Sequence, residues 1–270
     1  MKKTRIIIIS LIIVLCVIAV AVAIIFQMTE NDYKKAANKE QSTADDIELI
    51  KNNFNNIFNN DITGNYENVQ KEDENKAVVY TTAEKEETIP NKYDLDVQIP
   101  KINIDNEITK KWNSEIKSTF QNKAANILSN TEKYTVYKVK YHTYINNNIL
   151  SLIVKANLKE GGNPERVIIK TYNYDLEKNA EVSLNDIISN KQLKKEDIEN
   201  KIKEEIKNKK DYENTLIQLG YETYNRNSND DMYKTENINN FILGENGRLY
   251  IIFAYGNKTY TSETDMIIIE

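Results

Sequence analysis

The sequence has few of the side chains that catalysis and metal binding usually use. Its 270 residues include one cysteine, Cys16, and one histidine, His142. A single cysteine cannot form an intramolecular disulfide, and no Cys/His cluster is present that could hold structural zinc. His142 lies inside a predicted strand without an acidic neighbour in sequence. We therefore interpret it as a surface histidine rather than a general base.

Glycine and proline are also scarce, at seven and three residues. No glycine-rich phosphate loop is present, and no serine stands in the glycine pattern of a nucleophile elbow. Asn225, Asn227, Asn229 and Glu236 have calcium-loop spacing, but three of them are neutral amides and Asp230 replaces the required glycine. We expect no metal, no cofactor and no enzymatic activity. A hydrolase that uses scattered carboxylates is a weaker alternative.

Charged residues are absent from one long stretch, residues 6–26. A helix of this length spans roughly 31 Å, which matches the hydrocarbon core of a bilayer. Small residues at 19–23 would also suit cleavage of a signal peptide. However, the apolar run continues through Phe26, which favours an uncleaved transmembrane anchor over residues 6–27.

The orientation of this anchor follows from the basic residues before it. Lys2, Lys3 and Arg5 favour the cytoplasmic side, so residues 1–5 form a cytoplasmic stub and the rest lies outside the cell membrane. Without these three residues, 33 of the 36 basic side chains remain against 41 acidic ones, a formal charge of about −8. This charge argues against nucleic acid as a partner and is compatible with a cationic one.

Residues 28–76 are polar and rich in asparagine, lysine and glutamate, which is typical of a stalk. One apolar stripe at helical spacing interrupts the stalk. It consists of Ile47, Ile50, Phe54, Ile57 and Phe58. We interpret it as a short amphipathic helix; self-association is an alternative, although three turns are short for a coiled coil.

From residue 77 the pattern changes to alternation and predicts strands at 77–82 and 93–99, the second ended by Pro100. A helix is predicted at 106–128, with Trp112 as a core anchor. The apolar face of this helix consists of Ile108, Trp112, Ile116, Phe120, Ala124 and Ile127. We expect these elements to form a companion module over residues 77–130.

A C-terminal α+β domain is expected over residues 131–270. Its predicted strands and helices cover residues 134–145, 149–158, 166–176, 184–188, 198–206, 211–219, 249–254 and 260–269. The first three strands have short connections and predict an antiparallel meander, and Gly256-Asn257 predicts the turn of a final hairpin. The fold class is therefore α+β, with an antiparallel sheet and helices on one face, after one transmembrane helix.

Six tyrosines crowd the strands of the meander. They are Tyr134, Tyr137, Tyr141, Tyr144, Tyr172 and Tyr174. Such rings can stack on sugars or on a protein partner, whereas cross-strand aromatic pairing within the fold is the simpler interpretation.

Several motifs in this region resemble a known family. Residues 161–162, 170–176 and 182–188 read Gly-Gly, Lys-Thr-Tyr-Asn-Tyr-Asp-Leu and Val-Ser-Leu-Asn-Asp-Ile-Ile, and residues 97–102 and 112–116 read Val-Gln-Ile-Pro-Lys-Ile and Trp-Asn-Ser-Glu-Ile. Together they resemble the extracytoplasmic domain of unknown function, with its companion module, of RsiV-type lysozyme-sensing anti-sigma factors and PdaC-type peptidoglycan deacetylases. The resemblance covers about residues 77–270.

The resemblance has departures that bear on function. Asn163-Pro164 stands where family members commonly have Ala-His after the double glycine. Five cytoplasmic residues are too few for a specific interface with a sigma factor, and we expect no deacetylase domain after residue 270. The resemblance therefore implies a membrane-anchored binding or sensing module of a bacterial cell envelope, with peptidoglycan glycan or a cationic wall hydrolase such as lysozyme as ligand. The alternative is an anti-sigma-type transducer that acts through a partner membrane protein.

The turn at Glu160–Glu165 is the candidate ligand-binding segment, because loops on a rigid sheet often carry binding groups. Gly161 and Gly162 let the backbone approach a partner closely, and the flanking carboxylates would steer a cationic protein. An ordinary hairpin connection is the alternative. The candidate ligand-binding residues are Glu160, Gly161, Gly162, Asn163, Glu165, Tyr172 and Tyr174.

Overall fold

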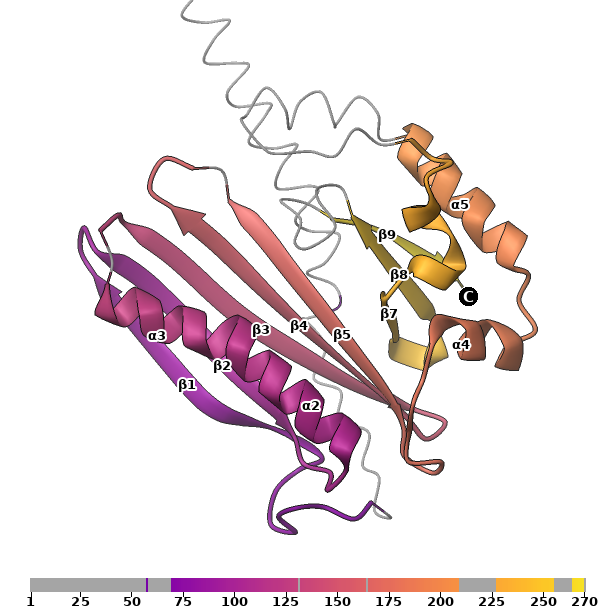
Figure 1. Ribbon diagram of the computed structural model, residues 1–270, viewed down its shortest axis with the longest axis horizontal. Coiled ribbons are helices and arrows are strands. Elements are labelled where there is room, and N and C mark those ends of the chain that lie inside the picture. Colours follow the sequence, from indigo (N-terminus) through magenta and orange to yellow (C-terminus); the bar gives the residue numbers. More distant parts are fainter. Residues whose placement is uncertain are drawn as a thin grey trace, which may run out of the picture. The chain divides into compact units, whose positions relative to one another are not determined.

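The computed structural model describes residue 57 and residues 69–130, 132–163, 165–208, 227–254 and 264–269 (Figure 1). Among these residues, no helix has both the length and the apolar character that a membrane span requires. The predicted anchor at residues 6–27, the predicted helix at 211–219 and the turn at Gly256-Asn257 lie outside the described residues and stay predictions.

The largest element is a six-stranded sheet whose strands lie side by side in sequence order. The strands are β1 (Val79–Ile89), β2 (Tyr93–Ile102), β3 (Thr135–Asn146), β4 (Ile149–Glu160), β5 (Arg166–Asp175) and β6 (Ala180–Glu181). Neighbouring strands are antiparallel except β2 and β3, which pair in parallel from Tyr93 with Thr135 to Val97 with Val139. The α+β class and the β3–β4–β5 meander are confirmed. The parallel pair was not predicted.

A helical crossover joins the two parallel strands, because parallel neighbours cannot be connected by a tight turn. It consists of α2 (Glu107–Ile116), a π-helical turn η1 (Lys117–Gln121) and α3 (Asn122–Ser129). The Asn106 side chain caps its start by accepting a hydrogen bond from the Ile108 amide at 2.8 Å. Figure 1 shows this helical run lying across one face of the sheet, as the apolar stripe predicts.

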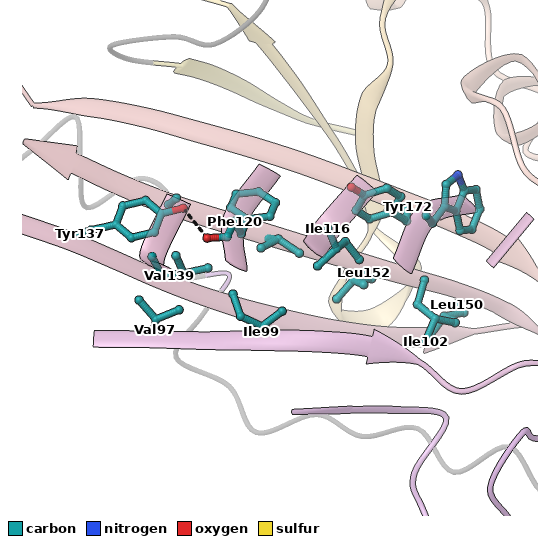
Figure 2. Close-up of a cluster of buried hydrophobic side chains, with 14 of the residues drawn as sticks. Val97, Ile99, Ile102, Ile116, Phe120, Tyr137, Val139, Leu150, Leu152 and Tyr172 are labelled. Atoms are coloured by element: carbon teal, nitrogen blue, oxygen red, sulfur yellow. Dashed lines mark hydrogen bonds between the residues drawn. The ribbon is translucent and has the colours of Figure 1, made fainter. Parts of the chain in front are cut away.

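The apolar face of the crossover packs on the sheet and forms the main core (Figure 2). Phe120 is fully buried among side chains of β2, β3 and β4, and its carbonyl accepts a hydrogen bond from the Tyr137 hydroxyl at 3.3 Å. The Trp112 ring lies 5.4 Å from the Tyr172 ring and 6.1 Å from the Tyr174 ring. Trp112 is 6% exposed, which confirms its predicted role as a core anchor.

Pro100 does not end the second strand, contrary to the prediction. β2 continues through it to Ile102, and Pro100 pairs with Thr81 of β1 beside a register shift between Thr81 and Ala83. Pairing of β2 with β3 stops at Val97. Pro100 has no N–H to donate, and it lies where the pairing with β1 is irregular and the pairing with β3 has already stopped, so no ladder hydrogen bond is lost.

The C-terminal strands form a second, three-stranded antiparallel sheet. Its strands are β7 (Asn240–Leu243), β8 (Leu249–Ala254) and β9 (Thr264–Ile269). The predicted pairing of the last two strands is confirmed. β7 was not predicted, because four residues are too few to show a period of two.

The remaining helices pack with the second sheet rather than with the first. They are α4 (Leu184–Asn190), α5 (Lys195–Asn208) and the 3-10 turns η2 (Asp231–Tyr233) and η3 (Thr235–Asn237). A further 3-10 turn, η4 (Glu245–Gly247), lies in the connection between β7 and β8. The predicted stripe Ile198, Ile202 and Ile206 of α5 is buried in one cluster with apolar side chains of β7 and β8. The sequence placed all helices on one face of one sheet, whereas the structure divides them between two sheets, each with its own apolar surface to cover.

One edge of β7 pairs with β8, and the other edge is bonded to side chains of the first sheet. The Phe241 amide donates a hydrogen bond to Thr171 Oγ1 at 3.1 Å, and the Phe241 carbonyl accepts one from Asn173 Nδ2 at 2.8 Å. The Leu243 amide donates to Ser151 Oγ at 3.1 Å. These side chains replace the backbone groups that a neighbouring strand would offer.

Three further bonds complete this arrangement. Asn146 Nδ2 donates to the carbonyl oxygens of Leu243 and Gly244 at 2.9 and 2.8 Å. The Ser151 hydroxyl donates to Asn173 Oδ1 at 2.7 Å, so the buried polar atoms are linked to one another. We call the four side chains of Asn146, Ser151, Thr171 and Asn173 the side-chain ladder.

The described part of the predicted stalk contacts the fold. Ile57 is 2% exposed and clusters with apolar residues of both sheets, and its carbonyl accepts a hydrogen bond from the Tyr144 hydroxyl at 2.8 Å. Val69 is buried in the main core. Residues 28–76 therefore contain buried contacts that their polar composition did not predict. The first sheet also runs across the predicted module boundary at residues 130–131, because β2 pairs with β3.

Candidate functional site

The turn between β4 and β5 is the segment that the sequence marked as ligand-binding. Gly161 has a φ of +58°, the left-handed region that favours glycine, and its N–H donates to the Tyr134 carbonyl at 2.8 Å. Gly162 has no atom within 4 Å of the position that a Cβ would take, so it faces open space. Pro164 lies outside the described residues. Gly161 thus ties the turn to the residue before β3, and the space beside Gly162 is free for a ligand.

Glu160 is held by two cationic side chains. Lys123 Nζ lies 2.8 Å from one carboxylate oxygen, and Arg166 Nη2 lies 2.5 Å from the other. The hydrogen bond from Lys123 and the positive charges of both partners hold the pKa of Glu160 below its usual value of 4.5. Because Lys123 belongs to α3 and Arg166 to β5, the carboxylate ties the helix to the turn.

A pocket of about 310 Å³ lies where α3, the connection from α3 to β3 and the β4–β5 turn meet. Its lining residues are Lys123, Asn126, Ile127, Asn130, Glu132, Lys133, Thr135, Glu160 and Asn163. Two of the predicted site residues, Glu160 and Asn163, are among them. Every described lining residue except Ile127 has a polar or charged side chain, and none of them is aromatic.

The helix contributes to the pocket through one face. Lys123, Asn126, Ile127 and Asn130 follow one another at helical spacing, so their side chains lie above one another. Ile127 is 5% exposed and belongs to the main core. α3 ends here, with the Asn130 amide donating to the Asn126 carbonyl at 2.9 Å. The position of this wall is therefore fixed by core packing.

Five polar side chains of the lining have no hydrogen-bond or ion-pair partner among the described residues. They belong to Asn126, Asn130, Glu132, Lys133 and Asn163, whose side chains form neither a hydrogen bond nor an ion pair with any described residue. A Cβ placed on Gly161 would lie 3.5 and 3.6 Å from two carbons of Lys133, so the lysine stem lies against the glycine backbone. The amide and charged groups are thus available to a ligand.

The negative charge predicted beside the double glycine is compensated by cations at Glu160. Glu160 is engaged by two cations, and Glu165 Oε1 accepts a hydrogen bond from Asn157 Nδ2 at 2.6 Å. Because Lys123 and Arg166 neutralise its charge locally, Glu160 contributes less than a free carboxylate to any field that would steer a cationic protein.

Tyr172 and Tyr174 do not join the turn. They are 5% and 0% exposed in the main core beside Trp112, and burial raises the pKa of the Tyr172 hydroxyl. Tyr172 lies six residues along β5 from Arg166, about 20 Å from the turn at the rise of an extended strand. The rings cannot stack on a ligand while they are buried. Of the tyrosines considered for stacking, Tyr134 is the most exposed, at 44%.

His142 is half-buried rather than a surface residue, and its ring lies 4.6 Å from that of Tyr144. In the segment with calcium-loop spacing, Asn227 Oδ1 accepts a hydrogen bond from the Asn229 amide at 3.1 Å, and Glu236 lies in η3. Asn225 lies outside the described residues. Among the residues that the structure describes, no three His, Cys, Asp or Glu side chains are grouped as metal ligands.

The lining residues from α3 were missed at the sequence level. The available signal was the spacing of Lys123, Asn126 and Asn130, three polar residues on one helical face beside the apolar stripe. This spacing alone is common on solvated helices. The spacing indicates a site only because the β4–β5 turn lies across the pocket from α3. The parallel β2–β3 pairing brings these two segments together.

Two solved structures of DUF3298 family proteins are similar to this chain. The protein from Pseudomonas aeruginosa PAO1 is 10% identical with a TM-score of 0.37, and the match covers 70% of this chain and 85% of that one. The protein from Bacteroides fragilis NCTC 9343 is 14% identical with a TM-score of 0.33, covering 66% and 80%. No protein-family model and no curated protein matches the chain. Similarity at this level does not assign the chain to a family, and the resemblance to RsiV-type and PdaC-type proteins stays a prediction.

Proposed function

We propose that the protein is a non-enzymatic binding or sensing module of the bacterial cell envelope, held at the outer face of the membrane by an anchor at residues 6–27. Its ligand is a small polar component of the cell wall. The observation that carries the proposal is the pocket between α3 and the β4–β5 turn, with its unpaired polar side chains.

The size and lining of the pocket support a small ligand. A volume of about 310 Å³ lies at the lower end of the range for ligand pockets, roughly 300–1,000 Å³, and suits a monosaccharide or a dipeptide. Asn126, Asn130 and Asn163 each offer a donor and an acceptor. Ion pairs and core packing hold the walls in place before a ligand arrives, which reduces the entropy lost on binding.

The test is co-sedimentation of the full-length protein, in mild detergent, with purified insoluble cell wall. The variant Asn126→Ala/Asn130→Ala removes two pocket amides and should reduce binding about tenfold or more, because each lost hydrogen bond contributes about 1 kcal/mol. Failure of the wild-type protein to sediment with the wall would overturn the proposal.

The matched control is Asn122→Ala. Asn122 is an exposed asparagine on the same helix that does not line the pocket. This variant should bind like the wild type. Equal losses in Asn122→Ala and in the double variant would mean that the pocket is not the binding site.

A further inference from the structure

The pocket holds one acidic and one basic side chain that pair with no other described residue. Glu132 and Lys133 are consecutive, exposed, and line the pocket, and neither forms an ion pair with a described residue. The other two charges of the lining, Lys123 and Glu160, are bonded to each other at 2.8 Å. The charges that a ligand can meet are therefore one carboxylate and one ammonium.

The Lys133 stem has a defined course, because its carbons lie against Gly161. A glycine in the left-handed conformation permits this packing, and any larger residue there would be strained. Lys133 is thus partly ordered before binding, so less side-chain entropy is lost when it contacts an anion.

The neutral part of the lining favours a peptide over a sugar. Sugar recognition commonly uses an aromatic ring against the face of the sugar, and this lining contains no aromatic side chain. The three unpaired amides can instead pair with peptide N–H and carbonyl groups, which have the same donor and acceptor chemistry.

We infer that the pocket binds a short zwitterionic peptide, with its carboxylate at Lys133, its ammonium at Glu132 and its peptide group at the asparagine amides. Glu160 does not contact the ligand in this arrangement. It positions the wall by holding Lys123 and Arg166 together. The inference rests on the proposed function and narrows its ligand to the peptide part of the cell wall rather than the glycan.

The experiment is calorimetric titration of the full-length protein in detergent with matched probes. The first probe is D-alanyl-D-alanine, which carries both charges. Its C-terminal amide lacks the carboxylate, its N-acetyl form lacks the ammonium, and di-N-acetylchitobiose represents the sugar. The two blocked peptides should bind three- to fivefold more weakly than the parent, since fivefold corresponds to about 1 kcal/mol for an exposed charge pair.

Charge-removing variants link each probe to one side chain. Lys133→Gln should weaken the parent peptide three- to fivefold and leave the affinity of the C-terminal amide unchanged. Glu132→Gln should do the same for the parent and spare the N-acetyl form. Lys159→Gln, which removes an exposed lysine of β4 outside the pocket, should leave every affinity unchanged.

The outcomes separate this inference from the proposed function. Equal or stronger binding of the disaccharide, with wall co-sedimentation intact, would overturn the peptide assignment and leave the proposed function standing. Equal affinities of the parent and the blocked peptides would overturn the zwitterion assignment in the same way. No binding of any probe, together with no co-sedimentation, would overturn both.

Discussion

Asn173→Ala should destabilise the fold by about 3 kcal/mol. Asn173 is 4% exposed, and its amide makes two bonds, one to the Phe241 carbonyl and one from the Ser151 hydroxyl. Each bond contributes about 1 kcal/mol net, and the buried Phe241 carbonyl that is left without its donor costs about 1 kcal/mol or more in addition. For a domain of this size, a loss of about 3 kcal/mol lowers the melting temperature by roughly 6–12 °C.

Urea unfolding of the full-length protein in mild detergent measures this loss. Trp112 is the only tryptophan and is buried beside β5, so its fluorescence reports unfolding of the main core. The matched control is Asn157→Ala, which removes a half-buried asparagine bonded to Glu165 at the open end of the sheet and should cost less than 1 kcal/mol. If the two variants lose the same free energy of unfolding, the ladder does not hold the second sheet.

Three further predictions concern single side chains. Glu160→Gln should reduce the free energy of unfolding by about 1 kcal/mol at pH 7, because partly exposed ion pairs are screened. Because the pKa of Glu160 is lowered in the folded protein, its ion pairs add stability above pH 4.5, and this stability is lost as the pH falls through the pKa of the folded state. The difference in free energy of unfolding between the variant and the wild type should therefore vanish in acid. A difference that does not change with pH would contradict this. Tyr172→Phe should leave stability unchanged or raise it, because the buried Tyr172 hydroxyl has no hydrogen-bond partner among described residues. Tyr137→Phe should instead lower the free energy of unfolding by about 1 kcal/mol, because it loses the hydrogen bond to the Phe120 carbonyl. Ile57→Ala should cost about 2–4 kcal/mol in thermal or urea unfolding, and a smaller loss would show that the contact is peripheral.

Local patterns predicted the elements of the fold better than their arrangement. The stripe through Trp112 and Phe120 identified the crossover helix, and alternation identified β3, β4 and β5 almost to the residue. The pairing of Tyr93 with Thr135 brings together residues that are distant in sequence, and no local signal encodes it. Pro100 misled the prediction, because proline is tolerated where neighbouring strands do not require its N–H.

The candidate site was predicted in part for the same reason. The turn at Glu160–Glu165 was identifiable from its glycines, and Asn163 does line the pocket. Tyr172 and Tyr174 were wrongly grouped with it, although their strand positions place them on the face that the Trp112 helix covers. The wall of the pocket that α3 forms, which includes Lys123, could not be predicted without knowing that the crossover brings α3 next to the β4–β5 turn.

The side-chain ladder also has a consequence for the rates of folding and unfolding. Its bonds to the backbone of β7 and of Gly244 join residues that are 68 to 98 positions apart, whereas the β3–β4–β5 meander is built from adjacent hairpins. Closing such long loops is slow, and the ladder side chains are aligned only after the meander exists. The ladder should therefore form after the main folding barrier and act mainly on the rate of opening. The lifetime of the folded protein, rather than the speed at which it folds, is then set by four polar side chains.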